Sequence, residues 1–228
     1  MNPNQQPVWL ITGAAGALGR ELVGLVLQSG ADCIALDRNA RGLDALHDRM
    51  IELGHAPPAL MPLDLIGAGP DDYDELAGTI EEQFGRLDVI VHNAAMFAAL
   101  RPLEHQPPEE WMKILQTGLT GPCLLNRALL PLMRQAESAR LVFINDHHCL
   151  DKPANWGAYG VAQAGRHWMT RALAAEIGPR GPRVLDIDPG PFYSSLRAAA
   201  WPVARPDELP DVATAAINVF TQIQQGVQ

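Results

Sequence analysis

The chain contains 228 residues, of which 47% are hydrophobic and 19% are charged, and its formal net charge is −9; this balance is typical of a globular domain, and an acidic surface disfavours nucleic acid and membranes as partners. The three cysteines fit neither a disulfide framework nor paired zinc knuckles, and no apolar run reaches the roughly 18 residues that a membrane helix needs. Because the polar N-terminus has no signal-peptide pattern either, we expect a cytoplasmic protein.

Short apolar runs that end near glycine or polar residues predict strands along the chain. The expected strands lie in VWLIT (8–12), DCIALD (32–37), APPALMPLDL (56–65), LDVIVHNAA (87–95), ARLVFIN (139–145) and PRVLDIDPG (182–190). Segments with helical periodicity follow them, at residues 17–30, 40–54, 73–85, 107–135, 157–178 and 205–225. The fourth of these segments is expected to bend near TGLTGP (117–122).

Strands that alternate with helices predict an α/β fold with a parallel sheet. We expect residues 1–228 to form a single Rossmann-like, doubly wound domain, with about six parallel strands and helices on both faces. No further strand is expected after the last helix.

The stretch TGAAGALG joins the first expected strand to the first expected helix. Its glycines, Gly13, Gly16 and Gly19, permit a tight turn, a close approach of a pyrophosphate to the backbone, and close packing of the helix on the sheet. Free N–H groups at the start of the helix favour phosphate. A flexible loop is the alternative, but this position between strand and helix favours a dinucleotide site that includes Ala15 and Leu18.

Asp37 ends the second expected strand, where a carboxylate can accept hydrogen bonds from the adenine ribose. A 2′-phosphate would be repelled there, so the sequence favours NAD over NADP. Arg38 follows directly and can turn toward such a phosphate, which leaves NADP possible.

These features and several later motifs resemble the short-chain dehydrogenase/reductase family over nearly the whole chain. The resemblance rests on TGAAGALG, on DL (64–65), on HNAA (92–95), on Tyr159 after the fifth strand and on DPGPFYS (188–194) after the sixth. It implies a nicotinamide dinucleotide as cofactor. The family's contacts then fall on Asp64 and Leu65 at the adenine, Asn93 and Ala94 at the end of the fourth strand, Pro189 and Gly190 at the nicotinamide, and Ser194, where the family usually has a threonine.

The family reduces carbonyls or oxidises alcohols with a serine, a tyrosine, a lysine and an asparagine, and only Tyr159 remains of these four. By the same resemblance, Asp146 occupies the serine position, Gln163 the lysine position and Gly118 the asparagine position. A lysine cation would favour the tyrosine phenolate, whereas Gln163 is neutral and an ionised Asp146 nearby would raise the pKa of Tyr159. Gln163 can still hydrogen-bond to ribose hydroxyls, so it preserves a cofactor contact without the charge.

Other groups near the tyrosine are candidates for acid–base chemistry. Asp146 can accept a proton with Tyr159 as a hydrogen-bond donor, and His147 or His148 can act as acid or base near neutral pH. Successive strand residues face opposite sides, so at most one histidine is expected to point into the cleft. The run DHHC also suggests a metal site, but adjacent residues converge poorly on one ion, and we predict none.

Two functions follow from this pattern. The first is an oxidoreductase with non-standard or weak catalysis on an unknown carbonyl or alcohol. The second is a cofactor-binding protein without turnover, such as a sensor or a scaffold. The substrate is not indicated, although five apolar residues are expected to wall its pocket: Met96, Trp156, Phe192, Tyr193 and Trp201.

We also expect a homodimer. In this family two long helices commonly pair across a two-fold axis, and here they correspond to residues 119–135 and 157–178. The second helix presents Trp168, Met169 and Leu173 among small residues, a surface suited to burial by a partner. The missing seventh strand removes a surface that relatives use to form tetramers.

Overall fold

A single parallel sheet of six strands lies within the residues that this computed structural model describes, 6–203 and 205–226. The strands are β1 (Val8–Thr12), β2 (Asp32–Asp37), β3 (Ala59–Pro62), β4 (Val89–His92), β5 (Arg140–Ile144) and β6 (Arg183–Ile187). Their order is β3-β2-β1-β4-β5-β6, and each neighbouring pair is parallel. The predicted doubly wound sheet is confirmed. Residues 1–5, 204 and 227–228 of the expected domain lie outside the described residues.

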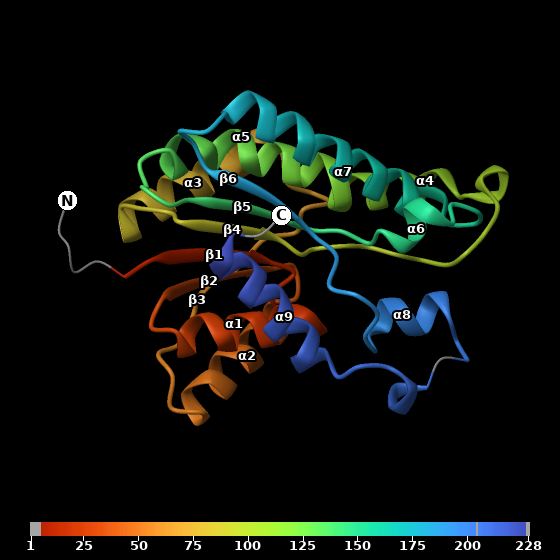
Figure 1. Cartoon of the computed structure of the whole chain (residues 1–228), viewed down its shortest axis with the longest axis horizontal. Coiled ribbons are helices and arrows are strands. Elements are labelled where there is room, and N and C mark those ends of the chain that lie inside the picture. Colours follow the sequence, from red (N-terminus) through yellow and green to blue (C-terminus); the bar gives the residue numbers. More distant parts are fainter. Residues whose placement is uncertain (1–5, 204, 227–228) are drawn as a thin grey trace.

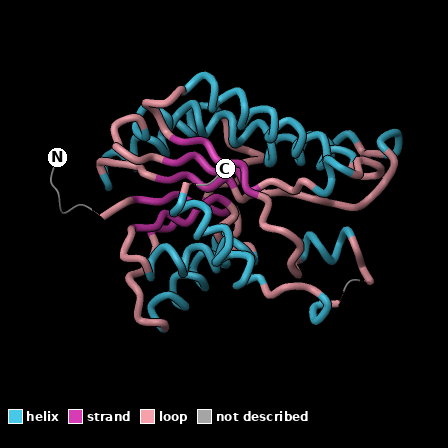
Figure 2. Tube along the Cα trace, in the orientation of Figure 1, coloured by secondary structure: helices cyan, strands magenta, loops and turns pink. Residues whose placement is uncertain are grey.

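Helices cover both faces of the sheet (Figure 1). They are α1 (Ala17–Gln28), α2 (Ala40–Glu52), α3 (Pro70–Phe84), α4 (Pro108–Leu115), α5 (Gly121–Met133), α6 (His148–Asp151), α7 (Gly157–Ile177), α8 (Ser195–Ala200) and α9 (Val212–Gln225). One face carries α1, α2 and α9, and the other carries α3, α5 and α7, so the sheet forms the middle of three layers (Figures 1 and 2).

The strand sequences account for these layers because alternate side chains point to opposite faces. In β1, Trp9 and Ile11 pack in the core with α1, α2 and α9, whereas Val8 and Leu10 pack in the core with α3 and α5. Every residue of β1 is buried, as expected for a parallel strand with helices on both sides. The two cores hold β1 and β4 at the centre, where the strand order reverses.

The fourth helical segment is broken where the sequence predicted a bend. A π-helical turn at Gln116–Thr120 separates α4 from α5, and Pro122 lies in the first turn of α5. Proline has no N–H for a regular helical hydrogen bond, which favours such a break. The turn brings Gly118 against α7, where a Cβ on Gly118 would lie 3.1 Å from the Cβ of Ala162.

All three cysteines are free thiols. Cys33 in β2 and Cys149 in α6 are buried, and burial raises the pKa of the Cys149 thiol to about 12. Cys123 on α5 is exposed. None of the helices in the described part of the chain is long and apolar enough to cross a membrane.

Candidate cofactor and active site

A cavity of about 650 Å³ opens at the carboxyl ends of the strands, where ligands commonly bind in doubly wound sheets. It extends from Asp37 at the end of β2, past the glycine-rich turn, to Asp146 and Tyr159 beyond β5. Every residue predicted to contact a cofactor lines this cavity except Gly19. The volume lies in the range of small-molecule and cofactor sites.

The geometry of the glycine-rich turn explains why Gly13 lines the cavity and Gly19 does not. Gly13 has a φ of 67°, and a Cβ there would lie 2.9 Å from the Cα of Ala94, so no larger residue fits. A Cβ on Gly19 would lie 2.8 Å from the Cα of Ala14. Gly19 therefore packs α1 against the turn instead of facing the cavity, and the cradle left open by this turn fits a phosphate group.

Asp37 does more than end β2, because both its carboxylate oxygens bind backbone N–H groups. Oδ2 accepts a hydrogen bond from Ala15 N at 3.0 Å and Oδ1 accepts one from Asn39 N at 2.9 Å. The carboxylate thus ties the glycine-rich turn to the end of β2. Arg38 is exposed and also lines the cavity, so a guanidinium lies at this end of the site.

Asn93 joins the carboxyl ends of β4 and β1. Its Nδ2 donates to the carbonyl oxygens of Thr12 and Gly13 at 3.0 and 3.1 Å, and its backbone N–H donates to Thr12 Oγ1 at 3.0 Å. These bonds join the end of β4 to the start of the glycine-rich turn. Ser194 lines the cavity too, and its hydroxyl caps α8 by accepting from Arg197 N at 3.1 Å.

The buried Tyr159 and the partly buried Asp146 form a hydrogen-bonded pair at the other end of the cavity. The Tyr159 hydroxyl lies 3.3 Å from Asp146 Oδ2, and Asp146 Oδ1 accepts from Cys149 N at 3.3 Å. Burial of the phenol, and then the charge of Asp146, hold the pKa of Tyr159 well above its usual value. The tyrosine is therefore a neutral donor, and the carboxylate is its acceptor.

Gln163 is buried, with 2% of its surface exposed, and lines the cavity below this pair. Its Oε1 accepts a hydrogen bond from Asp146 N at 3.0 Å, which leaves the amide N–H groups as the donors available to a ligand. The amide thus holds the backbone of Asp146 in place. Gly118 packs against Ala162 of α7 and, having no side chain, offers no polar group at the asparagine position.

Arg166 is a functional candidate that the sequence interpretation missed. Its guanidinium is fully buried and donates to the carbonyl oxygens of His92 (2.6 Å), Ile144 (2.9 Å) and Ala94 (3.3 Å). Burial lowers its pKa to about 10. The signal was the spacing: Arg166 lies seven residues after Tyr159, on the same buried stripe of α7.

The two histidines after β5 take different positions. His148 lines the cavity, where its ring centroid lies 5.6 Å from that of Trp201, whereas His147 does not line it. Of the expected apolar walls, Met96, Phe192 and Trp201 line the cavity, but Tyr193 and Trp156 do not. Trp156 is buried behind the wall, with its ring centroid 5.5 Å from that of Tyr159.

Arg197 adds a cation to this wall. Its guanidinium carbon lies 3.8 Å from the ring centroid of Trp201, and the residue lines the cavity. The sequence interpretation did not include it.

Comparison with known proteins agrees with this arrangement. A family model described as short chain dehydrogenase matches residues 7–203. The uncharacterized oxidoreductase YciK of Escherichia coli strain K12 is 32% identical over 200 residues, which cover 88% of this chain and 79% of that protein. The chain therefore belongs to the short-chain dehydrogenase family.

Solved structures show the same likeness. The structure of yciK from E. coli has a TM-score of 0.92 at 29% identity and covers 98% of this chain and 92% of its own. A short chain dehydrogenase from Escherichia coli CFT073, complexed with NADPH, has a TM-score of 0.91 at 30% identity, covering 96% and 91%. One from Shigella flexneri 2a, complexed with NADP, has a TM-score of 0.87 at 31% identity, covering 92% and 87%.

Proposed function

We propose that this chain binds a nicotinamide dinucleotide in the cavity and acts as an oxidoreductase with non-standard catalysis on an alcohol or carbonyl compound. The observation that carries this proposal is the cavity itself, which connects Arg38 and the glycine-rich turn with the Tyr159–Asp146 pair. The NADP and NADPH complexes of two similar structures support the cofactor class. Three free cysteines support a reducing, cytoplasmic location.

NADP(H) is our proposed cofactor, in place of the NAD that the sequence rule favoured. Asp37 already accepts two backbone hydrogen bonds, so its oxygens are engaged within the protein. Arg38 is exposed beside it and can pair with a 2′-phosphate. The complexes of similar proteins point the same way.

The chemistry left to the protein is the movement of one proton. When bound, the nicotinamide accepts or supplies the hydride at the substrate carbon. An alcohol beside Tyr159 can pass its proton to the tyrosine oxygen while the tyrosine proton moves to Asp146 Oδ2. The tyrosine stays neutral, the carboxylate becomes a carboxylic acid, and no buried phenolate forms.

This relay favours alcohol oxidation over carbonyl reduction. Reduction that starts with Asp146 as a carboxylate would draw the proton from Tyr159 and leave a phenolate 3.3 Å from that carboxylate, whereas oxidation starts from this ionised form without such a phenolate. A phenolate and a carboxylate at this distance in a largely buried site repel each other strongly. Position 163, being neutral, offers no charge to offset them.

A cofactor-binding protein without turnover is the second candidate. The observation that favours it is the use of Gln163, whose oxygen is committed to the backbone of Asp146 where the family has a lysine. Such a protein would bind the dinucleotide and use it as a signal or a structural ligand.

Calorimetry with NADPH and NADH tests the binding step. We expect NADPH to bind more tightly, and Arg38→Gln to weaken NADPH about tenfold, equivalent to about 1.4 kcal/mol, while NADH changes little. Arg41→Gln is the matched control, because Arg41 is exposed on α2 and does not line the cavity. Tighter binding of NADH would show that the charge of Asp37 governs the choice.

Turnover is then followed by the absorbance of reduced nicotinamide, with NADP and an alcohol panel, and with NADPH and a carbonyl panel. We expect slow oxidation that is lost in both Tyr159→Phe and Asp146→Asn, and little ketone reduction. Tight binding without turnover in either direction would support the second candidate. Robust ketone reduction that survives Asp146→Asn would overturn the relay.

A further inference from the structure

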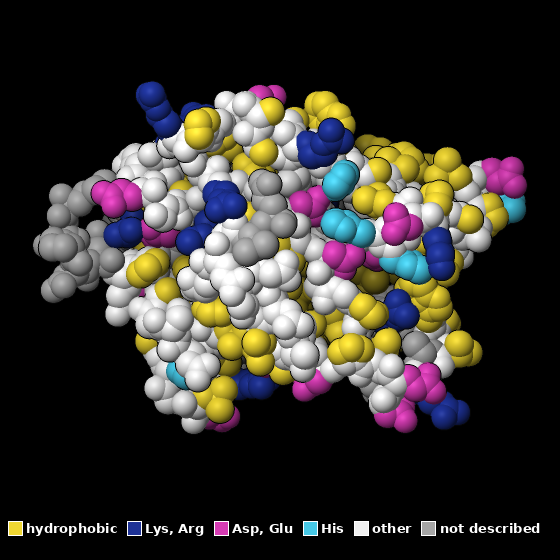
Figure 3. All heavy atoms as spheres, in the orientation of Figure 1, with side chains coloured by type: hydrophobic (Ala, Val, Ile, Leu, Met, Phe, Trp, Pro, Cys, Tyr) yellow, Lys and Arg dark blue, Asp and Glu magenta, His cyan; other side chains and the backbone are white. Residues whose placement is uncertain are grey.

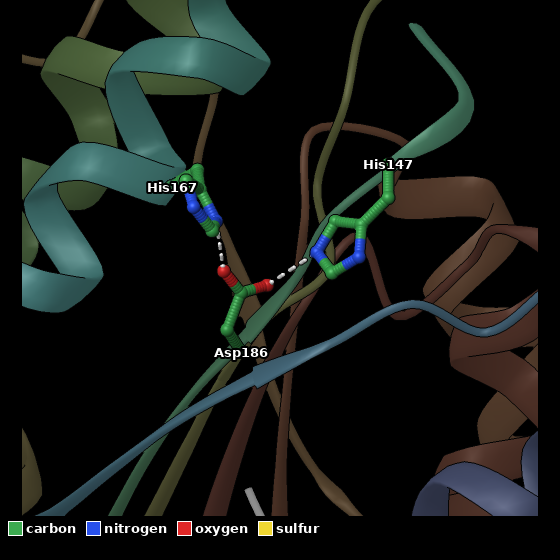
Figure 4. A group of neighbouring side chains, drawn as sticks. All are labelled: His147, His167 and Asp186. Atoms are coloured by element: carbon green, nitrogen blue, oxygen red, sulfur yellow. Dashed lines mark hydrogen bonds and ion pairs between the residues drawn. The ribbon is translucent and has the colours of Figure 1, made fainter. Parts of the chain in front are cut away.

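Two histidines and an aspartate from separate elements meet outside the cofactor cavity (Figure 4). His147 follows β5, His167 lies on α7 and Asp186 lies on β6. His147 Nε2 is 3.1 Å from Asp186 Oδ1, and His167 Nδ1 is 2.6 Å from Asp186 Oδ2. One possible ligand atom from each of the three side chains lies within 4.8 Å of the other two.

From this cluster we propose that the protein binds one divalent transition-metal ion, such as Zn²⁺, through His147, His167 and Asp186, with water at the open position. Two imidazole nitrogens and a carboxylate oxygen are a common donor set for Zn²⁺ and related ions. The run DHHC alone did not indicate this site, because the partners of His147 lie 20 and 39 residues further along the chain. This proposal therefore replaces the prediction of no metal.

The distances suit such an ion. Ligand bonds of about 2.1 Å in a tetrahedral site place neighbouring donor atoms about 3.4 Å apart. The two pairs that involve Asp186 are already at or below this spacing. To hold an ion, the His167–Asp186 pair must open from 2.6 Å and the two histidine nitrogens must settle around the ion. About 40% of each histidine side chain is exposed, which leaves room for both rings to move.

The surroundings of the cluster orient its donors as outer-shell groups do in metal sites. Asn145 Nδ2 donates to Asp186 Oδ1 at 2.7 Å, which fixes the carboxylate. Asp188 Oδ2 accepts from His147 N at 3.0 Å and lies 3.9 Å from His147 Nδ1. Asp188 thus holds the backbone at His147, and its carboxylate lies on the Nδ1 side of the ring while Nε2 faces Asp186.

The cluster is open to solvent on one side, so an ion can enter. In the space-filling view, histidine and acidic side chains gather on the face shown, in the region where Figure 1 places β6 and α7 (Figure 3). The alternative is a set of histidine–aspartate ion pairs without an ion, and the experiment separates the two.

The test is titration of untagged protein with Co²⁺, followed by its visible absorption, and with Zn²⁺ by calorimetry. We expect one ion per chain, bound at micromolar concentration, and at least a tenfold loss of affinity in both His167→Gln and Asp186→Asn. His47→Gln is the matched control: His47 also lies beside an aspartate, at 3.3 Å from Asp48 Oδ1, but no third ligand from residues 6–203 or 205–226 joins it. The metal affinity of the His47→Gln variant should equal that of the wild type.

Saturable binding that persists unchanged in His167→Gln, or the absence of saturable binding in the wild type, would overturn the proposal and leave the ion-pair cluster. His167 lies on a helix surface, so its variant is expected to fold even where Asp186→Asn, in a strand, does not; circular dichroism checks both. The readout needs no nicotinamide or substrate, so its failure is distinguishable from failure of the proposed oxidoreductase function.

Discussion

Tyr159 and Arg166 show how charge is redistributed along one side of α7. The family lysine would lie one turn after the tyrosine, but here the cation comes at the next turn and is fully buried. Its charge opposes the rise in the pKa of Tyr159, although burial and Asp146 outweigh it. Arg166 also binds carbonyl oxygens after β4 and β5, so its main effect is expected on the position of these strand ends.

We predict that Arg166→Met lowers the free energy of unfolding by about 2–4 kcal/mol. Removing a buried charge avoids its desolvation cost, but three carbonyl oxygens lose their donor, and each buried unsatisfied group costs about 1–3 kcal/mol. The loss corresponds to a fall in Tm of about 4–16 °C for a chain of this size. Calorimetry measures the Tm. Arg166→Lys keeps the charge but not the planar guanidinium, so its Tm should lie between those of the wild type and Arg166→Met. An unchanged Tm in Arg166→Met would show that these bonds contribute nothing net.

The buried His92 makes the free energy of unfolding depend on pH. Burial lowers its pKa from 6.5 to about 3, so the folded state resists a proton that the unfolded state accepts. Stability is therefore complete above pH 6.5 and is lost as the pH falls from about 6.5 toward about 3, at about 1.4 kcal/mol per pH unit. Urea unfolding at pH 7.5 and pH 5 should differ by about 2 kcal/mol from this group.

In His92→Gln this part of the pH dependence should disappear, whereas exposed His47→Gln should retain it. Equal slopes in the wild type and His92→Gln would contradict the assignment.

The π-helical turn between α4 and α5 controls whether the family's catalytic set can be rebuilt. Asp146→Ser with Gln163→Lys and Gly118→Asn restores the four residue types, but the new asparagine Cβ would meet the Cβ of Ala162 at 3.1 Å. We predict that Gly118→Asn alone costs about 1–3 kcal/mol through overpacking. Adding Ala162→Gly should recover part of the lost Tm.

Ketone reduction should rise only when Ala162→Gly is combined with the three catalytic substitutions. Gln163→Lys alone should not restore it, because the lysine cannot accept the hydrogen bond from Asp146 N and instead pairs with the Asp146 carboxylate. High activity in Gln163→Lys alone would contradict this explanation.

The elements that the sequence predicted well are those with long apolar patterns or glycine and proline at fixed positions. The strands, the break near Pro122 and the glycine-rich turn follow from such local signals, whereas the later cavity residues were implied by the family resemblance. The short helices α6 and α8 have four and six residues, too few for a periodicity to show, and Arg197 lies on α8. Arg166 and the partners of His147 were missed for another reason: their contacts join residues far apart in sequence, and only the packing of α7 on the strand ends brings them together.

For the whole molecule, the exposed side of α7 bears on assembly. Met169 and Leu173 pack against the protein's own core, which leaves Trp168, with 68% of its surface exposed, and Val161, with 40%, as exposed apolar groups on α7. We predict a homodimer through α5 and α7, and Trp168→Asp should give a monomer in light scattering at micromolar concentration. Leu53→Asp is the control, because it alters an exposed apolar residue away from these helices and should leave the mass unchanged. A monomeric wild type would contradict the prediction.

The unequal exposure of the three cysteines provides a handle on that assembly. Cys123 projects from α5, on the layer expected at the dimer interface, while Cys33 and Cys149 are shielded inside the fold. A maleimide fluorophore should therefore attach at one place per chain without mutagenesis. Because assembly would cover Cys123, the fraction of chains protected from the reagent should rise with protein concentration, and the concentration at half-protection would give the dissociation constant of the dimer.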